Sequence, residues 1–268
     1  MRNFLYIVKY TVVDIINQKS FFVLLAVSIG FLLLLRGCYS GNYVVNGKSL
    51  DSVTVAWHAS IIAFHIVAGG VLLIAAILSM NLLSRDRDDG TVQYMLSKPL
   101  ARITYVAGRA VGIWLVSFAF MFVLHLTIFV ITLISAGGAM PGYLAASCLC
   151  SVNVLFMVLL VCTMSLFMPD FAAAMVGIGV VAVSFVADSL FHAAQSRLGQ
   201  ALLANHPAGI PGWEMVWPKV CSMQYCAVSL IKGDVFRPLG SVHPVLVMAG
   251  YVCLAAAGLA FAFQRKEI

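Results

Sequence analysis

Charged residues are scarce in this chain. Lysine and arginine contribute 16 residues and aspartate and glutamate 10, so that 10% of the 268 positions carry a charged side chain. A soluble domain carries roughly 25%. Hydrophobic residues make up 62% of the sequence, and the mean hydropathy is +1.02. This composition excludes a soluble globular protein. It predicts an all-α integral membrane protein, because a helix satisfies its own backbone hydrogen bonds in lipid.

The sequence also lacks the short motifs of several enzyme classes. It contains no H-E-x-x-H, no G-x-S-x-G and no C-x-x-C. The stretch Gly47-Lys48-Ser49 matches the end of a phosphate-binding loop, but Asn42 stands where that motif requires its first glycine. We therefore expect a chain that is not an enzyme and that binds no nucleotide cofactor, metal or nucleic acid.

Six apolar runs are candidates for membrane spans, each of which needs about 20 residues. They are about Ser20–Leu35, Trp57–Leu83, Ile103–Ser135, Tyr143–Met168, Phe171–Phe191 and Val242–Phe263. Because these spans take up so much of the chain, no room remains for a separate catalytic domain. We expect residues 1–268 to form a single transmembrane domain.

The distribution of basic residues predicts the orientation of these spans. Cytoplasmic loops of membrane proteins are enriched in lysine and arginine. With a cytoplasmic N-terminus, the two short outer loops contain only Arg36 and Lys48. The inner segments then contain ten basic residues: Arg2, Lys9, Lys19, Arg85, Arg87, Lys98, Arg102, Arg109, Arg265 and Lys266. We therefore expect a multi-pass protein of the cytoplasmic (inner) membrane with both termini inside the cell.

Two segments outside the apolar runs have helical patterns. Apolar residues recur at helical spacing within residues 1–19, which predicts a helix lying on the inner membrane surface in contact with lipid. The segment 192–241 is too long for a simple connector, and its stretches SRLGQALLA and KVCSMQYCAVSLI predict two short amphipathic helices. Trp217 in this outer segment fits an anchor at the membrane surface.

The segment 84–102 between the second and third apolar runs carries the densest charge. Five consecutive charged residues, Arg85 to Asp89, cannot enter the bilayer. The stretch VQYMLS follows Gly90-Thr91 and predicts one or two helical turns that end at Pro99. The alternative is an ordinary solvated hairpin. The candidate functional residues here are Arg85, Asp86, Arg87, Asp88, Asp89, Gly90, Thr91, Tyr94, Met95, Leu96, Pro99 and Arg102.

This segment resembles the first cytoplasmic loop of the membrane subunits of ATP-binding cassette (ABC) exporters of the second type. The shared pattern is acidic-x-x-x-G-T-x-x-x-L-x-x-P-x-x-R followed by glycine and a basic residue. The matching positions are Asp86, Gly90, Thr91, Leu96, Pro99, Arg102, Gly108 and Arg109. Asp86, Val92 and Arg109 depart from the usual glutamate, leucine and lysine.

The resemblance implies a permease whose segment 84–102 is a coupling helix docked on a separate ATPase. Two ATPase subunits would bind the ATP and Mg²⁺, and two permeases would form the path for an exported substrate. Glycines could then pack the two permeases together as a homodimer, or could instead pack helices within one subunit. The candidates are Gly108-x-x-x-Gly112, Gly69-Gly70, Gly177-x-Gly179 and Gly250 with Gly258. The outer segment 192–241 would act as a gate or receive an outer, periplasmic partner. A permease that transmits force to an outer maturation protein without moving solute, as in nitrous-oxide reductase maturation, has the same architecture.

Three ionisable residues inside the spans are candidates for a translocation path: His65, His125 and Asp188. Intramembrane ionisable groups are costly and often functional, although a histidine can also bond a neighbouring helix. Opposed histidines could alternatively hold a haem in an electron-transfer subunit, but such a protein needs axial pairs at two depths. Of the cysteines, Cys38, Cys221 and Cys226 would face the oxidising outer side, where one disulfide could form, although Cys221 and Cys226 on one regular helix would not pair.

Overall fold

The computed structural model describes residues 2–39, 44–45, 48–49, 52–80, 101–136, 140, 142–195, 216–233, 236 and 242–265. Within these residues the fold is helical, apart from one small hairpin in which β1 (Val44–Val45) pairs with antiparallel β2 (Lys48–Ser49). The helices are α1 (Arg2–Ile16), α2 (Lys19–Tyr39), α3 (Ser52–Met80), α6 (Arg102–Ala136), α7 (Gly142–Met164), α8 (Asp170–Gln195), α11 (Val220–Lys232) and α12 (Pro244–Arg265). The expected all-α class is confirmed.

Each of the six apolar runs coincides with one long helix. Five of these, α3, α6, α7, α8 and α12, are long and apolar enough to cross a membrane, with mean hydropathies between 2.0 and 2.7 over their best windows. A sixth candidate consists of α1 and α2 taken together, and these two helices meet at an angle of 64°. The described residues therefore contain five to six candidate spans.

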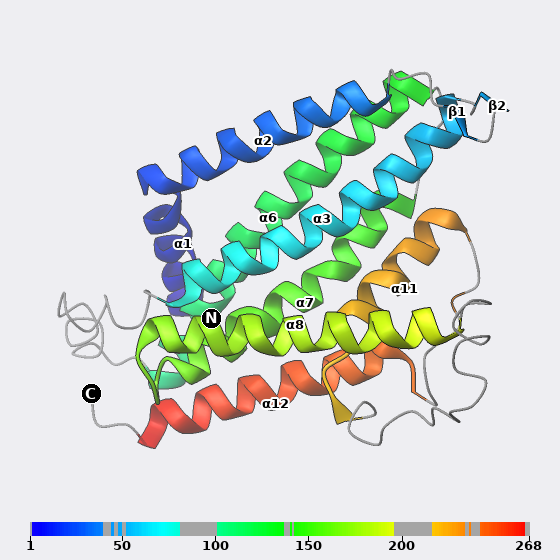
Figure 1. Ribbon diagram of the computed structural model, residues 1–268. Coiled ribbons are helices and arrows are strands. Elements are labelled where there is room, and N and C mark those ends of the chain that lie inside the picture. The colour runs from blue at the N-terminus through cyan, green and yellow to red at the C-terminus, as the bar shows by residue number, and fades with distance from the viewer. Residues whose placement is uncertain are drawn as a thin grey trace.

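The helix α7 lies at the centre of the bundle. It packs against α3, α6, α8, α11 and α12 (Figure 1). Of the 18 consecutive residues of α7 with the highest hydropathy, 61% are buried inside the protein. The corresponding shares are 33% for α8 and 22% for α12. The helices α8 and α12 therefore expose apolar surface, as expected of helices that face lipid.

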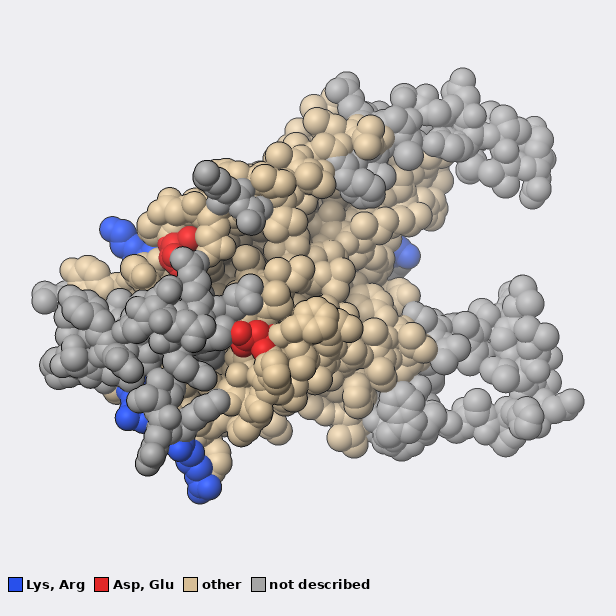
Figure 2. All heavy atoms as spheres, turned by 60° about the vertical axis from the view of Figure 1, so that its left-hand side comes forward, with Lys and Arg blue, Asp and Glu red and all other residues tan. Residues whose placement is uncertain are grey.

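The helix α1 and the end of α12 lie at the same end of the bundle (Figure 1). Described charged residues at this end include Lys9 and Asp14 of α1, Arg102 of α6 and Arg265 of α12. On the face shown in Figure 2, most of the visible lysine and arginine side chains lie toward this end, although a further basic side chain is visible toward the other end, and uncharged atoms cover most of the described surface between the ends. This distribution agrees with an apolar belt that crosses a bilayer.

Candidate functional site

The predicted coupling segment 84–102 lies outside the described residues, except for residues 101 and 102. The candidate residues that lie outside the described set are Arg85, Asp86, Arg87, Asp88, Asp89, Gly90, Thr91, Tyr94, Met95, Leu96 and Pro99. Arg102 is exposed and begins α6, whereas α3 ends at Met80. The helices on either side of the segment, α3 and α6, pack along each other, and Met80 and Arg102 lie at the end of the bundle where α12 ends.

The helix α1 packs directly on the first turns of α6, immediately after this segment. Two glycines of α6 allow the close approach. A methyl group added at Gly108 would lie 2.8 Å from Cγ2 of Ile7, and one added at Gly112 would lie 2.5 Å from Cβ of Thr11. Real Cβ atoms do not come so close, so the contact between the two helices requires glycine at both positions.

Arg109 lies between these glycines and is almost fully buried, with 1% of its surface exposed. Its Nη1 donates a hydrogen bond to Oγ1 of Thr11 at 3.3 Å and lies 3.8 Å from Oδ2 of Asp14. The guanidinium also lies over the ring of Tyr10, 5.2 Å from its centroid. Arg109 was expected on the cytoplasmic surface, but its charge is instead enclosed by α1. A buried arginine depends on such partners, because an unpaired charge in the interior is costly.

For Gly108 and Gly112, these contacts favour packing within one subunit over a contact between two copies. Gly108 and Gly112 pack α1 within one subunit and are not available to a second copy. Gly177 of α8 likewise faces α7, because an added methyl group would lie 2.8 Å from Cγ2 of Val161. A methyl group added at Gly69, Gly70, Gly179 or Gly250 would have no neighbouring atom within 4 Å. These four positions therefore leave room for close contact with another helix.

At the opposite end of the bundle, α11 is inserted between the span helices. The stretch KVCSMQYCAVSLI was expected to form a short amphipathic helix, and a 13-residue helix is present there. Most of its residues are buried against α7, α8 and α12. The carbonyl of Leu230 lies so close to Gly142 at the start of α7 that no side chain would fit between them. Thirteen residues are too few to span a bilayer, so α11 enters the bundle from one side only.

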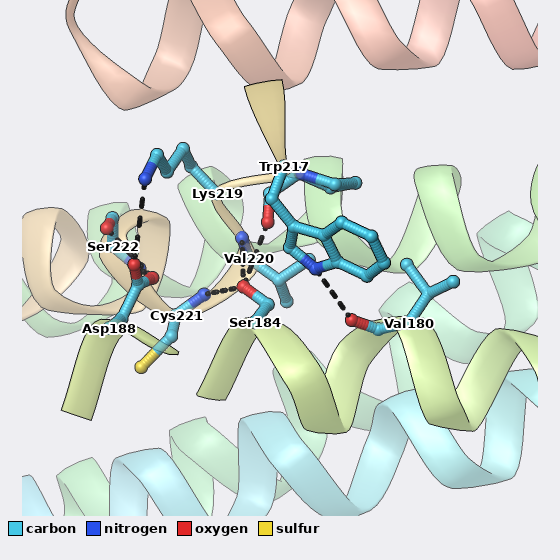
Figure 3. Close-up of polar contacts among 9 residues, drawn as sticks. Val180, Ser184, Asp188, Trp217, Lys219, Val220, Cys221 and Ser222 are labelled. Carbon is cyan, nitrogen blue, oxygen red and sulfur yellow. Dashed lines mark hydrogen bonds and ion pairs between the residues drawn. The ribbon is translucent and has the colours of Figure 1, made fainter. Parts of the chain in front are cut away.

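The N-terminus of α11 is capped by side chains of α8 (Figure 3). The N-cap residue Lys219 makes no side-chain cap of its own. Instead, the Ser184 hydroxyl accepts hydrogen bonds from the backbone N–H groups of Val220 (3.1 Å) and Cys221 (3.4 Å) and donates one to the carbonyl of Pro218 (2.9 Å). These bonds satisfy N–H groups that have no partner within their own helix.

Asp188 completes this cap one turn further along α8. Its Oδ2 accepts hydrogen bonds from the N–H and Oγ of Ser222, at 2.7 and 2.9 Å. Its Oδ1 lies 3.9 Å from Nζ of Lys219, and only 4% of Asp188 is exposed. A carboxylate at a helix N-terminus is stabilised by the N–H groups and the helix dipole. Asp188 therefore holds α11 in place.

The indole of Trp217 lies deeper in the bundle than the surface position expected for it. Its Nε1 donates a hydrogen bond to the carbonyl of Val180 at 3.2 Å, and Val180 lies near the middle of α8. The chain therefore reaches roughly mid-height of the bundle before α11 begins. Trp217 anchors this inner end and not the membrane surface.

Polar side chains of α3 and α7 hold the other side of α11. The Nδ2 of Asn153 donates to the carbonyl of Val220 at 2.9 Å, and Nδ1 of His65 lies 3.2 Å from Oε1 of Gln224. Oδ1 of Asn153 and Nε2 of Gln224 are buried and find no partner among the described residues. His65 also contacts the ring of Tyr225, with 5.3 Å between centroids.

The structure thus brings His65 and Asp188, two of the three residues proposed for a path, to α11 from different helices. The third, His125, is buried, and its ring stacks on Phe64. Its Nδ1 lies 2.9 Å from Oγ of Ser147, and its Nε2 lies 3.4 Å from the carbonyl oxygen of Phe64. Because both ring nitrogens of His125 have protein partners, neither is presented to a haem iron.

The cysteines of α11 are free and buried, as are Cys150 and Cys162 in α7. Cys221 and Cys226 are five residues apart on one helix and form no disulfide with each other. The side chain of Cys38 lies outside the described set.

Sequence reasoning missed Ser184 and Asn153, which contact α11, and Gln224, which lies on α11 and contacts His65. Ser184 and Asn153 are polar residues within long apolar runs, and this is the signal that could have identified them. Their partners are backbone groups of a segment more than thirty residues away, which no local pattern indicates.

Comparison with known proteins identifies the family. A family model described as ABC-2 family transporter protein matches residues 5–208, well over half of the chain. A search of curated proteins found no match. The matched residues include α1, the segment 84–102, Arg109 and Asp188, and they end before α11. Permeases of this family are multi-pass membrane proteins without catalytic activity, and they pair with ABC ATPase subunits. The chain therefore belongs to the ABC-2 family of transporter membrane proteins.

Proposed function

We propose that this permease exports its substrate across the cytoplasmic membrane and that residues 84–102 form the helix on which the ATPase acts. Two copies of the chain assemble with two ATPases, which bind ATP and Mg²⁺, and the permease itself holds no cofactor. Both termini and the coupling helix face the cytoplasm, and α1 lies along the inner surface of the membrane.

The observation that carries the proposal is the packing of α1 on α6 directly after the coupling segment. Gly108 and Gly112 bring the two helices into close contact, and buried Arg109 ties them through Thr11 and Asp14. A force applied at residues 84–102 would therefore move α6 and α1 as one unit. Since α6 also packs on α3 and α7, the movement would reach the centre of the bundle.

The position of α11 supports an outward gate. The helix begins near mid-height of α8 and ends beside the starts of α3 and α7, at the end opposite the coupling segment. Its N-terminal half is held by side-chain hydrogen bonds, which can break and reform without repacking a core. We infer that His65 and Asp188 act here, by fixing α11 in its closed position and by lining the path when α11 moves.

The test is reversal of charge in the coupling segment of the complete complex. The double variant Asp86→Lys/Asp88→Lys places like charge against the ATPase cleft, at a cost of several kcal/mol. We expect normal membrane insertion, together with loss of ATPase copurification or hydrolysis of ATP without export. Asp170→Lys is the matched control. Asp170 is the first residue of α8, directly after the connection from α7, and it lies at the same end of the bundle. Wild-type copurification and export in the double variant would refute the coupling assignment.

The same complex distinguishes export from transmission of force. Wild-type complex reconstituted in vesicles should move solute when ATP is supplied on the side of the coupling segment. If ATP hydrolysis changes the exposure of α11 to a water-soluble thiol reagent but no solute moves, the permease transmits force to an outer partner instead.

A further inference from the structure

An apolar groove of about 660 Å³ lies between α8 and α12, with α7 beside both helices. Its lining includes Leu160, Val180, Trp217, Leu254 and Gly258. Two of the polar side chains on its wall have partners within the protein. Oγ1 of Thr163 donates to the carbonyl of Leu159 at 2.7 Å, and the Trp217 Nε1 donates to Val180. The groove therefore offers a ligand mainly apolar packing surface.

The groove occupies one half of the bundle. It extends along α7 from Phe156 to Met164, which is the last residue of that helix. At 1.5 Å per residue this stretch is about 12 Å long, close to the roughly 15 Å of hydrocarbon in one leaflet. The segment 216–218 closes the groove near mid-height of α8. Its dimensions thus match one leaflet and not the whole bilayer.

A basic residue lies on the same helix face as the groove. Leu254, Gly258, Phe261 and Arg265 are spaced by four, three and four residues, which places them along one face of α12. Arg265 is exposed, and its guanidinium lies over the Phe261 ring, 4.3 Å from the centroid. It stands at the end of α12, about 10 Å beyond Gly258 at 1.5 Å per residue. This is the distance at which the headgroup of a lipid would lie.

We propose that the groove binds one acyl chain of an anionic phospholipid, whose headgroup pairs with Arg265. The lipid comes from the leaflet on the side where α12 ends, which is the cytoplasmic leaflet in the proposed topology. The acyl tail ends against Trp217, at the segment that leads into α11. The bilayer is as apolar as the groove, so preference for this site arises from packing and from the charge at Arg265.

The lipid can be detected by photolabelling of the complete complex. The complex is reconstituted in phosphatidylcholine vesicles with a small fraction of phosphatidylglycerol that carries a diazirine at the end of one acyl chain. We expect label on Leu160 and Leu254, in preference to Leu73, which is 47% exposed on α3 and lies outside the groove. A phosphatidylcholine probe with the same chain should label the groove about fivefold less, the factor expected for one basic residue near an anionic surface.

Two variants and one control test the geometry. Gly258→Leu fills the groove, and its Cβ fits, since the nearest side-chain atom would be Cγ2 of Thr163 at 3.8 Å. This variant should reduce groove labelling to the level of Leu73. Gly250→Leu places the same side chain in open space two turns away on α12 and should leave labelling unchanged. Arg265→Ala should abolish the preference for phosphatidylglycerol while labelling by the phosphatidylcholine probe persists.

Copurification with the ATPase shows whether each variant folds, and Gly258→Ala provides a milder substitution should the leucine variant fail. Equal labelling of the groove and of Leu73 in the wild-type complex would overturn the proposal in favour of general bilayer contact. Disulfide-linked pairs of chains formed in high yield by Leu254→Cys, in a Cys253→Ser background, would assign the groove to a second copy of this chain and would equally overturn it.

Discussion

The junction of α1 with α6 and the junction of α8 with α11 solve a similar problem in different ways. Each attaches a shorter helix to a long span, and each contains one buried charge whose oppositely charged partner lies almost 4 Å away. At the first junction, two glycines about one turn apart bring the two helices into direct contact. At the second junction, side chains of α8 bond the backbone at the start of α11.

The difference concerns how each junction can move. Close glycine contact has no alternative arrangement, because any displacement of α1 either opens a void or forces atoms together. Hydrogen bonds to a helix N-terminus can be exchanged for bonds to water or to another side chain at a small net cost. The first junction is therefore suited to transmitting a movement, and the second is suited to being opened by it.

The largest expected effect comes from Gly112→Leu. The added side chain would overlap Thr11, where even a methyl group lies 2.5 Å from Cβ, so α1 must leave α6. We expect a loss of about 3 kcal/mol or more in the docking of α1. The measurement is the accessibility of a cysteine introduced at position 7 by Ile7→Cys. Ile7 is 3% exposed in the wild type.

Gly70→Leu is the matched control for that variant, because Gly70 on α3 has nothing within 4 Å. It should leave position 7 protected. Protection of position 7 in the Gly112→Leu variant would show that the junction is adaptable, and the contrast with α11 would fail.

A somewhat smaller effect is expected for Asp188→Ala. The change leaves the N–H and hydroxyl of Ser222 and the ammonium group of Lys219 without their partner, at a cost of about 2–3 kcal/mol. Hydrogen exchange of residues 220–232 should increase, while residues 2–16 stay protected. Asp188→Asn keeps an acceptor oxygen and should give an intermediate rate. Unchanged exchange in the alanine variant would remove Asp188 from the cap.

The smallest effect is expected for Ser184→Ala. It removes the acceptor of two N–H groups but leaves Asp188 in place, so about 1–2 kcal/mol should be lost. Exchange should increase at Val220 and Cys221 and little beyond them. Ser117→Ala is a suitable control, because the Ser117 hydroxyl is buried on α6 and has no hydrogen-bond partner among the described residues. Equal responses to the two changes would mean that Ser184 is no more than a packing residue.

Much of the architecture could be predicted from the sequence. The six apolar runs became long helices because continuous apolarity is required wherever a helix faces lipid or another apolar helix. The short helix at 220–232 was also predicted. Its burial was not, because a polar face that meets other polar side chains has the same pattern as one that meets water. Gln224 illustrates this, since it contacts His65 inside the protein.

The sequence alone determined that this is a multi-pass membrane protein, and the pattern around Asp86, Gly90 and Pro99 indicated its family, because both are properties of consecutive residues. Only the tertiary structure decided that Gly108 and Gly112 contact α1 and not a second subunit, that Arg109 is buried, and that Ser184 and Asp188 cap α11. A small or polar residue on a helix shows that something packs or bonds there. Which partner does so depends on segments far away in the chain, and their position is set by the packing of the whole bundle.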